Sequence, residues 1–308
     1  MPWVWLGAAI MIVSEAATLA RIEPFWSWNT PIAWTGFIIF ADAIVWRARG
    51  SSWIRSSPGE FAALALASIP LWVVFEGFNL RLRNWHYVGL PEDRLLRYFG
   101  YAWSFATIWP AIFEAADLMA VARASRRRAP LKRSPTYETT HVRREAGGSN
   151  VGHRVSGAEW TSIIAGALML ASPFFVSSAA ARYLAAPVWL GFIFLLDPIN
   201  ARLGAESLWD DLPARRIDRL VNLSLSGLLC GLLWEFWNYW SRAKWHYTVP
   251  IMEHLKIFEM PVPGYFGFPA FAVECFTMYV FVRAVYAYVT SGLSRTRASS
   301  RLGRTIAL

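Results

Sequence analysis

The sequence predicts an all-α integral membrane protein with about eight transmembrane helices, arranged as two parallel-related repeats of four helices each. Three observations predict this fold class. Of the 308 residues, 56% are hydrophobic and 17% are charged, and the mean hydropathy of +0.32 exceeds that of ordinary soluble domains. The apolar residues gather in runs long enough to cross the roughly 30 Å hydrocarbon core of a bilayer. The second half of the chain also repeats a series of residues from the first half.

Apolar runs predict the helices in order along the chain. A transmembrane helix needs about 20 residues, and eight runs approach that length. They cover 2–20, 29–46, 60–80, 99–122, 160–179, 185–201, 219–240 and 264–289. The second and sixth runs carry the weakest signal, because each is short and contains an aspartate, Asp42 or Asp197. Many of the 18 tryptophans lie near the ends of the runs, which is typical of rings that anchor at the headgroup level.

A basic segment separates the first four runs from the last four. It contains Arg126, Arg127, Arg128, Lys132, Arg133, Arg143 and Arg144, followed by Gly147 and Gly148. This composition is typical of a disordered, solvated linker. The predicted domains are a first transmembrane repeat, a cytoplasmic linker, a second transmembrane repeat and a basic cytoplasmic tail, at 1–123, 124–158, 159–290 and 291–308.

The distribution of basic residues predicts the orientation of the chain. The net charge is +9, and the side that holds the linker carries about twice as many Lys and Arg residues as the other side. The protein is therefore expected in a bacterial-type inner membrane, with the linker and both termini in the cytoplasm. The first run alone favours the opposite orientation, since Arg21 follows it and no basic residue precedes it. Basic residues that flank apolar runs encode topology, so nucleic acid is not an expected partner.

The two halves share residues at matching spacing. The segment from Trp34 to Asp42 matches that from Trp189 to Asp197, and both contain Gly-Phe-Ile. Three further blocks pair Glu76, Asn79 and Arg83 with Glu235, Asn238 and Arg242, Trp85-His86-Tyr87 with Trp245-His246-Tyr247, and Glu114 with Glu274. Because each copy holds four predicted spans, equivalent helices point the same way. The copies are therefore expected to be related by an axis along the membrane normal.

A polar stripe recurs on the third and seventh predicted helices. Glu76, Asn79 and Arg83 are spaced i, i+3 and i+7 and so share one helix face, as do their counterparts in the second half. Charged groups in lipid cost a few kcal/mol each, so the stripe is expected to face inward, with its charges paired. It either locks the bundle through a Glu–Arg pair with a bridging Asn, or marks a functional path.

Two further glutamates lie deeper in the predicted helices. Glu114 and Glu274 have apolar and aromatic neighbours and no cation nearby in the sequence. A carboxylic acid in such surroundings is expected to be neutral and can donate a proton. Alternatively, it only hydrogen-bonds a neighbouring helix. Asp42 and Asp197 either belong to the same polar centre or mark the ends of their helices.

The histidines and cysteines do not indicate a metal site. His86 and His246 lie just past helix ends, where a histidine is more often an amphipathic anchor than a ligand, and neither half contains Glu-x-x-His. Cys230 and Cys275 lie inside apolar runs without metal-ligand spacing. The sequence therefore predicts neither a metal nor a redox cofactor.

The order of the repeated blocks resembles that of a known family. The second half has Trp234-Glu235, Trp245-His246-Tyr247, Pro269 and Glu274, and the first half has Trp72, Glu76, Trp85-His86-Tyr87, Pro110 and Glu114. This order resembles the lycopene cyclase domain of the membrane-embedded, tandem-repeat carotenoid cyclases. The resemblance covers roughly the last three helices of each unit, and a single glutamate stands where the family has an adjacent pair.

The resemblance implies a cyclase or isomerase of a carotenoid or another terpene-like isoprenoid. Such chemistry begins when an acid protonates a double bond or epoxide, and aromatic faces stabilise the carbocation until a base removes a proton. The candidate catalytic residues are Glu114 and Glu274 as acids, Glu76 and Glu235 as bases or charge stabilisers, and the neighbouring Asn79 and Asn238. The candidate substrate-binding residues are Trp72, Trp109, Trp234, Trp237, Arg83, Arg242, His86 and His246.

Two other functions are compatible with the sequence. A duplicated unit with polar groups at its interface is also a transporter design, so a non-catalytic transporter or lipid-binding protein is the alternative. A purely structural membrane protein is the third. Four glutamates around one enclosed apolar cavity would favour the cyclase, whereas separated glutamates or a water-filled path would favour the transporter.

Overall fold

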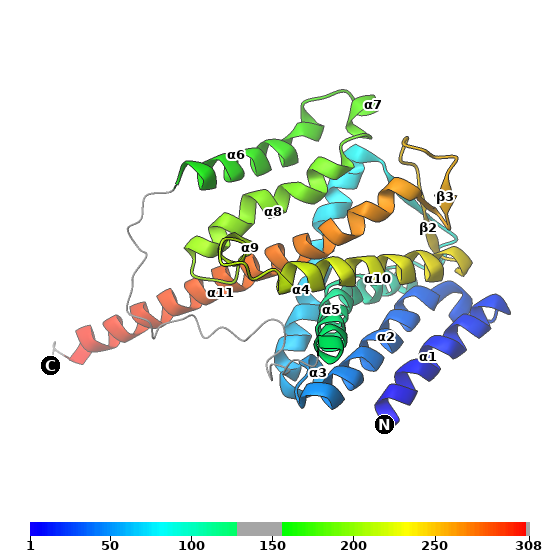
Figure 1. Cartoon of the computed structure of the whole chain (residues 1–308), viewed down its shortest axis with the longest axis horizontal. Coiled ribbons are helices and arrows are strands. Elements are labelled where there is room, and N and C mark those ends of the chain that lie inside the picture. Colours follow the sequence, from blue (N-terminus) through cyan, green and yellow to red (C-terminus); the bar gives the residue numbers. More distant parts are fainter. Residues whose placement is uncertain (128–155, 306–308) are drawn as a thin grey trace.

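The computed structural model describes residues 1–127 and 156–305 and is mostly helical (Figure 1). It describes side chains for residues 1–126 and 156–290. Its long helices are α1 (Pro2–Leu19), α2 (Phe25–Arg49), α4 (Pro58–Leu82), α5 (Arg94–Arg127), α6 (Gly157–Ala171), α8 (Ala185–Arg202), α10 (Asp218–Trp240) and α11 (Gly267–Thr305). Its short helices are α3 (Trp53–Ser56), η1 (Ser172–Phe174), α7 (Ser178–Ala181), α9 (Leu208–Asp211) and η2 (Val262–Phe266). The linker predicted at 124–158 lies largely outside the described residues.

Six of the described helices are long and apolar enough to cross a membrane: α1, α2, α4, α5, α10 and α11. The prediction of a helical membrane protein is confirmed at this level. A long helix also lies in each of the other two predicted runs, but α6 has only 15 residues. It ends earlier than predicted because the chain turns into η1 at Ser172 and Pro173, and proline cannot continue the hydrogen bonds of a helix. A count of eight spans stays a prediction.

The outer surface of the bundle is apolar. Large hydrophobic side chains are widely exposed there, among them Trp5 (69% exposed), Leu66 (69%) and Leu168 (66%). Exposed apolar surface on this scale marks contact with a partner or a membrane. Together with the lengths of the helices, it supports lipid as the surrounding solvent.

The helices form two flanks around a centre. Helices α1 and α2 pack together on one flank, α6 and α8 on the other, and α4, α5, α10 and α11 lie between them (Figure 1). Each flank has a close helix crossing at a pair of glycines. A Cβ atom on Gly7 would lie 2.6 Å from the Gly36 carbonyl oxygen, and one on Gly166 would lie 2.6 Å from the Gly191 carbonyl oxygen. Only glycine allows backbones to approach so closely.

Four short strands were not anticipated from the sequence. Strands β1 (Trp85–Val88) and β2 (Lys244–Tyr247) pair antiparallel, and β3 (Lys256–Ile257) pairs antiparallel with β4 (Met260–Pro261). The β1–β2 register places His86 opposite His246. The two Trp-His-Tyr copies thus pair with each other, and Figure 1 shows these strands at the end of the bundle away from the chain termini.

Candidate functional site

Two asparagines at the ends of α4 and α10 fix the paired strands. The Asn79 amide nitrogen donates to the Trp85 carbonyl at 2.9 Å, and its amide oxygen accepts from the Trp85 N–H at 3.2 Å. Asn238 makes the same two bonds with Trp245, at 2.9 and 3.0 Å. Each side chain replaces a strand partner for the first residue of the Trp-His-Tyr segment. The polar stripe therefore orders the strands through its asparagines.

The tyrosine of each strand forms a hydrogen bond with the glutamate of the same half of the chain. The Tyr87 hydroxyl donates to Glu76 Oε1 at 2.5 Å, and the Tyr247 hydroxyl donates to Glu235 Oε1 at 2.9 Å. This geometry follows from the period of a strand, because residues two apart face the same side. The tryptophan and tyrosine of each segment face inward, and the histidine between them faces outward.

The two tyrosine–glutamate pairs differ in their surroundings. Glu76 Oε1 also accepts from the indole N–H groups of Trp72 at 2.9 Å and Trp85 at 3.2 Å. Glu235 is 0% exposed, and its second oxygen has no hydrogen-bond partner among the described residues. Glu76 Oε1 thus accepts three hydrogen bonds, whereas Glu235 Oε1 accepts one, from Tyr247, and Trp245 lies beside the Glu235 carboxyl.

The tyrosines remain protonated at neutral pH. Burial raises the pKa of Tyr87 well above its ordinary value, and the neighbouring Glu76 raises it further. Burial and Glu235 have the same effect on the pKa of Tyr247. Both hydroxyls are therefore available as hydrogen-bond donors and as carriers of a proton.

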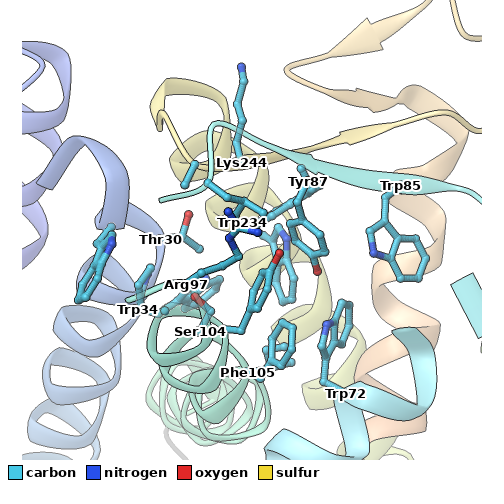
Figure 2. A pocket seen from close by; sticks show the side chains of 18 of the residues that line it. Thr30, Trp34, Trp72, Trp85, Tyr87, Arg97, Ser104, Phe105, Trp234 and Lys244 are labelled. Atoms are coloured by element: carbon cyan, nitrogen blue, oxygen red, sulfur yellow. The ribbon is translucent and has the colours of Figure 1, made fainter. Parts of the chain in front are cut away.

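Both tyrosines line one cavity. Figure 2 shows Tyr87 among the aromatic side chains of its wall. The cavity lies between the paired strands and the central helices and has a volume of about 110 Å³. A single water occupies roughly 10–15 Å³ on this measure, so the cavity holds a larger ligand. Aromatic residues on its wall include Trp34, Trp72, Trp85, Phe105, Trp189, Trp234, Trp245 and Phe271. The two tryptophans predicted here, Trp72 and Trp234, have ring centroids 5.6 Å apart.

The outer face of the strands carries a separate ionic cluster. Glu259 accepts from Lys244 Nζ at 3.0 Å and lies 2.9 Å from His246 Nδ1. Although burial raises the pKa of Glu259, Lys244 and His246 together lower it below its ordinary value. His86 and His246 have ring centroids 5.9 Å apart. Neither histidine lines the cavity, so the structure does not support their predicted contact with a substrate bound there.

No family model, curated protein or solved structure matches this chain. The resemblance to the lycopene cyclase domain therefore stays a prediction. Within the part of the chain that the structure describes, no three His, Cys, Asp or Glu side chains gather closely enough to hold a metal ion.

The deep glutamates lie away from the cavity. Glu114 and Glu274 are both 0% exposed, and neither residue lines the cavity. Glu114 lies beside the carboxyl of Asp42, close to the buried ion pair between Asp117 and Arg49. The four glutamates therefore do not surround one cavity, and by the criterion given above this separation favours the alternative of a transporter or lipid-binding protein. Their assignment as acids stays a prediction, and the deep pair has no contact with a ligand in this cavity.

The aspartates of the second and sixth runs have a local structural role. Asp42 accepts the Ile54 N–H at 2.9 Å, and Asp197 accepts the N–H groups of Leu208 and Trp209 at 3.0 and 2.6 Å. They hold the first turns of α3 and α9 against the preceding long helices. Both lie within a helix, α2 or α8, so neither marks a helix end.

The predicted pairing of the stripe glutamates with arginine is wrong. Arg242 pairs with Glu23 at 3.2 Å, and its guanidinium lies over Trp26. Arg83 is the C-cap of α4 with a left-handed φ of 53°, and its carbonyl accepts from Thr248. Both arginines follow their glutamates by seven residues, which places them past the last regular turn of the helix. They lie outside the cavity lining.

Two of the four predicted tryptophans pack in the core instead of lining the cavity. Trp109 is 0% exposed and donates its indole N–H to the Cys275 carbonyl at 2.8 Å. Trp237 packs edge-on against Trp34, with ring centroids 4.9 Å apart. These rings support the wall of the cavity from behind.

Sequence reasoning missed several lining residues at the starts of α2 and α5. Thr30 and Arg97 line the cavity, and so do Tyr101 and Ser104. In the sequence, Arg97 is only one of several basic residues beside the fourth apolar run. The sequence holds one relevant signal, the alternation within Trp-His-Tyr, which predicts that tryptophan and tyrosine face one side.

Proposed function

We propose that this protein is a membrane-embedded isoprenoid cyclase or isomerase that works by acid-initiated carbocation chemistry. The observation that carries the proposal is the pair of tyrosines, Tyr87 and Tyr247, that face one aromatic cavity while each is bonded to a glutamate, the half-buried Glu76 or the buried Glu235. An apolar aromatic cavity suits a hydrocarbon chain. The tyrosine–glutamate pairs supply a proton donor and a proton acceptor at its wall.

The proposal includes a two-fold relation between the halves, along the membrane normal. The asparagine clamps, the tyrosine–glutamate bonds, the aspartate contacts and the glycine crossings each occur once in either half. A two-fold axis between His86 and His246 would generate the antiparallel register of β1 and β2. Such an axis brings both tyrosines to one cavity.

The reaction would conserve every atom of the substrate. Tyr247 gives its hydroxyl proton to one carbon of a C=C bond and takes a proton from the neutral carboxyl of Glu235, so that a new C–H bond forms and the other carbon becomes cationic. The faces of Trp72 and Trp234 stabilise this cation. A neighbouring C–H bond then releases its proton through Tyr87 to Glu76, and a new C=C bond forms. Proton exchange with water restores the neutral Glu235 and the ionised Glu76 before the next turnover. We assign the base role to Glu76 because three donors support its carboxylate.

Expression in isoprenoid-producing hosts tests this function. We expect an isomerised or cyclised product in lipid extracts of hosts that accumulate different isoprenoid precursors. Tyr87→Phe and Tyr247→Phe should each lower its formation by at least about a hundredfold, because general acid–base groups contribute factors of about 10² to 10⁴. Tyr183→Phe, at a residue 55% exposed, is the matched control and should leave product formation unchanged.

Two results would contradict the proposal. The first is an unaltered isoprenoid profile in every host that holds the wild-type protein in its membrane. The second is product formation that survives both Tyr87→Phe and Tyr247→Phe. An isoprenoid that copurifies unchanged with the protein would instead favour the alternative function of lipid binding.

A further inference from the structure

Arg97 carries a positive charge at the cavity and has no counter-charge among the described residues. It lies in the first turn of α5, and Figure 2 shows its side chain extending into the pocket. Its Nε donates to the Pro91 carbonyl at 2.9 Å, which orients the guanidinium. A partly buried guanidinium in aromatic surroundings is costly unless an anion pairs with it.

Two other cations near β1 and β2, Lys244 and Arg242, already have partners. Lys244 also lines the cavity, but its ammonium bonds Glu259, and Figure 2 shows the side chain pointing away from the pocket. Glu23 pairs with Arg242. These groups therefore neither neutralise Arg97 nor compete with it for an anion.

Two buried donors beside the cavity also lack acceptors. The hydroxyl of Thr30, a residue 8% exposed, and the indole N–H of Trp234 have no hydrogen-bond partner among the described residues. Both residues line the cavity. A buried donor without an acceptor costs about 1–3 kcal/mol, and a ligand oxygen would relieve that cost.

We infer that the ligand ends in an oxyanion, a carboxylate or a phosphate, which is bound by Arg97 with help from Thr30 and Trp234. Arginine suits this role because its planar fork of N–H groups matches both anions. The apolar chain of the ligand rests on the proposed function, whereas the oxyanion rests on Arg97 and the two unpaired donors.

Binding of three probes with the same chain tests the inference. The full-length protein, purified in detergent, is titrated with geranylgeranyl phosphate, geranylgeranic acid and geranylgeraniol, and tryptophan fluorescence is measured. We expect one or both anionic probes to bind at least about tenfold more tightly than the neutral alcohol, a difference of about 1.4 kcal/mol. The ratio of the two anionic affinities shows which oxyanion the site prefers.

Variants and a competitor identify the residue responsible. Arg97→Gln should remove the preference for the anionic probes and leave the affinity for the alcohol unchanged, which also reports that the cavity is intact. Arg94→Gln removes the same charge from an exposed position in the same helical turn and should keep the preference. In the wild-type protein, millimolar inorganic phosphate should displace geranylgeranyl phosphate but not geranylgeraniol, a measurement that needs no variant.

The outcomes separate this inference from the proposed function. Equal affinity for all three probes, no competition by phosphate, or equal effects of Arg97→Gln and Arg94→Gln would overturn the oxyanion site. Selective binding of the anionic probes without any conversion would keep the site and remove the cyclase. Conversion of geranylgeraniol with no preference for anions would keep the cyclase and remove the oxyanion site.

Discussion

Single polar side chains organise the end of the bundle where the cavity lies. Asn238 satisfies both the N–H and the carbonyl of Trp245, and Tyr247 then bonds Glu235. An amide side chain fits this place because it presents a donor and an acceptor side by side. The position of each tyrosine thus depends on an asparagine as much as on its own glutamate.

Asn238→Ala should lower the free energy of unfolding by about 2–4 kcal/mol, because it leaves two backbone groups of Trp245 unpaired at about 1–3 kcal/mol each. Thermal unfolding of the detergent-purified protein measures the effect. Glu92→Ala, in an exposed loop, is the control and should have the same melting temperature as the wild type. Equal melting temperatures for Asn238→Ala and the wild type would show that the clamp does not hold the strand.

At the scale of elements, the two flanks depend on close helix crossings. A Cβ atom on Gly166 would lie 2.4 Å from the backbone nitrogen of Leu195 in α8, so any larger residue must separate the helices. Gly77 lies within α4, and a Cβ atom there would have no neighbouring atom of a described residue within 4 Å outside its own helix backbone. The same change at these two glycines should therefore have opposite effects.

Gly166→Ala should destabilise the protein by about 1–3 kcal/mol through overpacking. Gly77→Ala should be neutral or stabilise it by up to about 1 kcal/mol, because alanine loses less backbone entropy than glycine in a helix. Unfolding of both variants in detergent, followed by circular dichroism, measures the difference. The crossing would not be tight if Gly166→Ala proved as stable as Gly77→Ala.

At the scale of the whole molecule, the strands join the two halves at one end of the bundle. β1 comes from the first half and β2 from the second, so the cavity beneath them draws one tyrosine from each. Lipid-facing helices with exposed apolar side chains surround this centre. The cytoplasmic placement of both termini stays a prediction from the distribution of basic residues.

The positions of the helices could be predicted from the sequence because hydrophobicity is a local signal. Each of the eight apolar runs contains a long helix, and repeated spacing identified Glu76 and Glu235 as equivalent. A local signal also explains why α6 ends earlier than predicted, since Pro173 ends this helix within a run that is otherwise apolar.

The candidate site was harder to predict because its contacts join distant parts of the chain. Arg242 pairs with Glu23 and not with Glu235, although the helical spacing favoured the latter. Strand pairing between two four-residue segments has no periodic signal of its own. Arg97 becomes a candidate ligand-binding residue only once the fold places it at the cavity with Trp234.

The most direct test of the account is the mass of the product formed in D₂O. The purified protein, first exchanged into D₂O, is incubated with an isoprenoid that it converts, and the product is analysed by mass spectrometry. Acid-initiated isomerisation or cyclisation predicts a product with the elemental composition of the substrate and one deuterium from the solvent. A product without solvent deuterium, or with atoms gained or lost, would contradict the account.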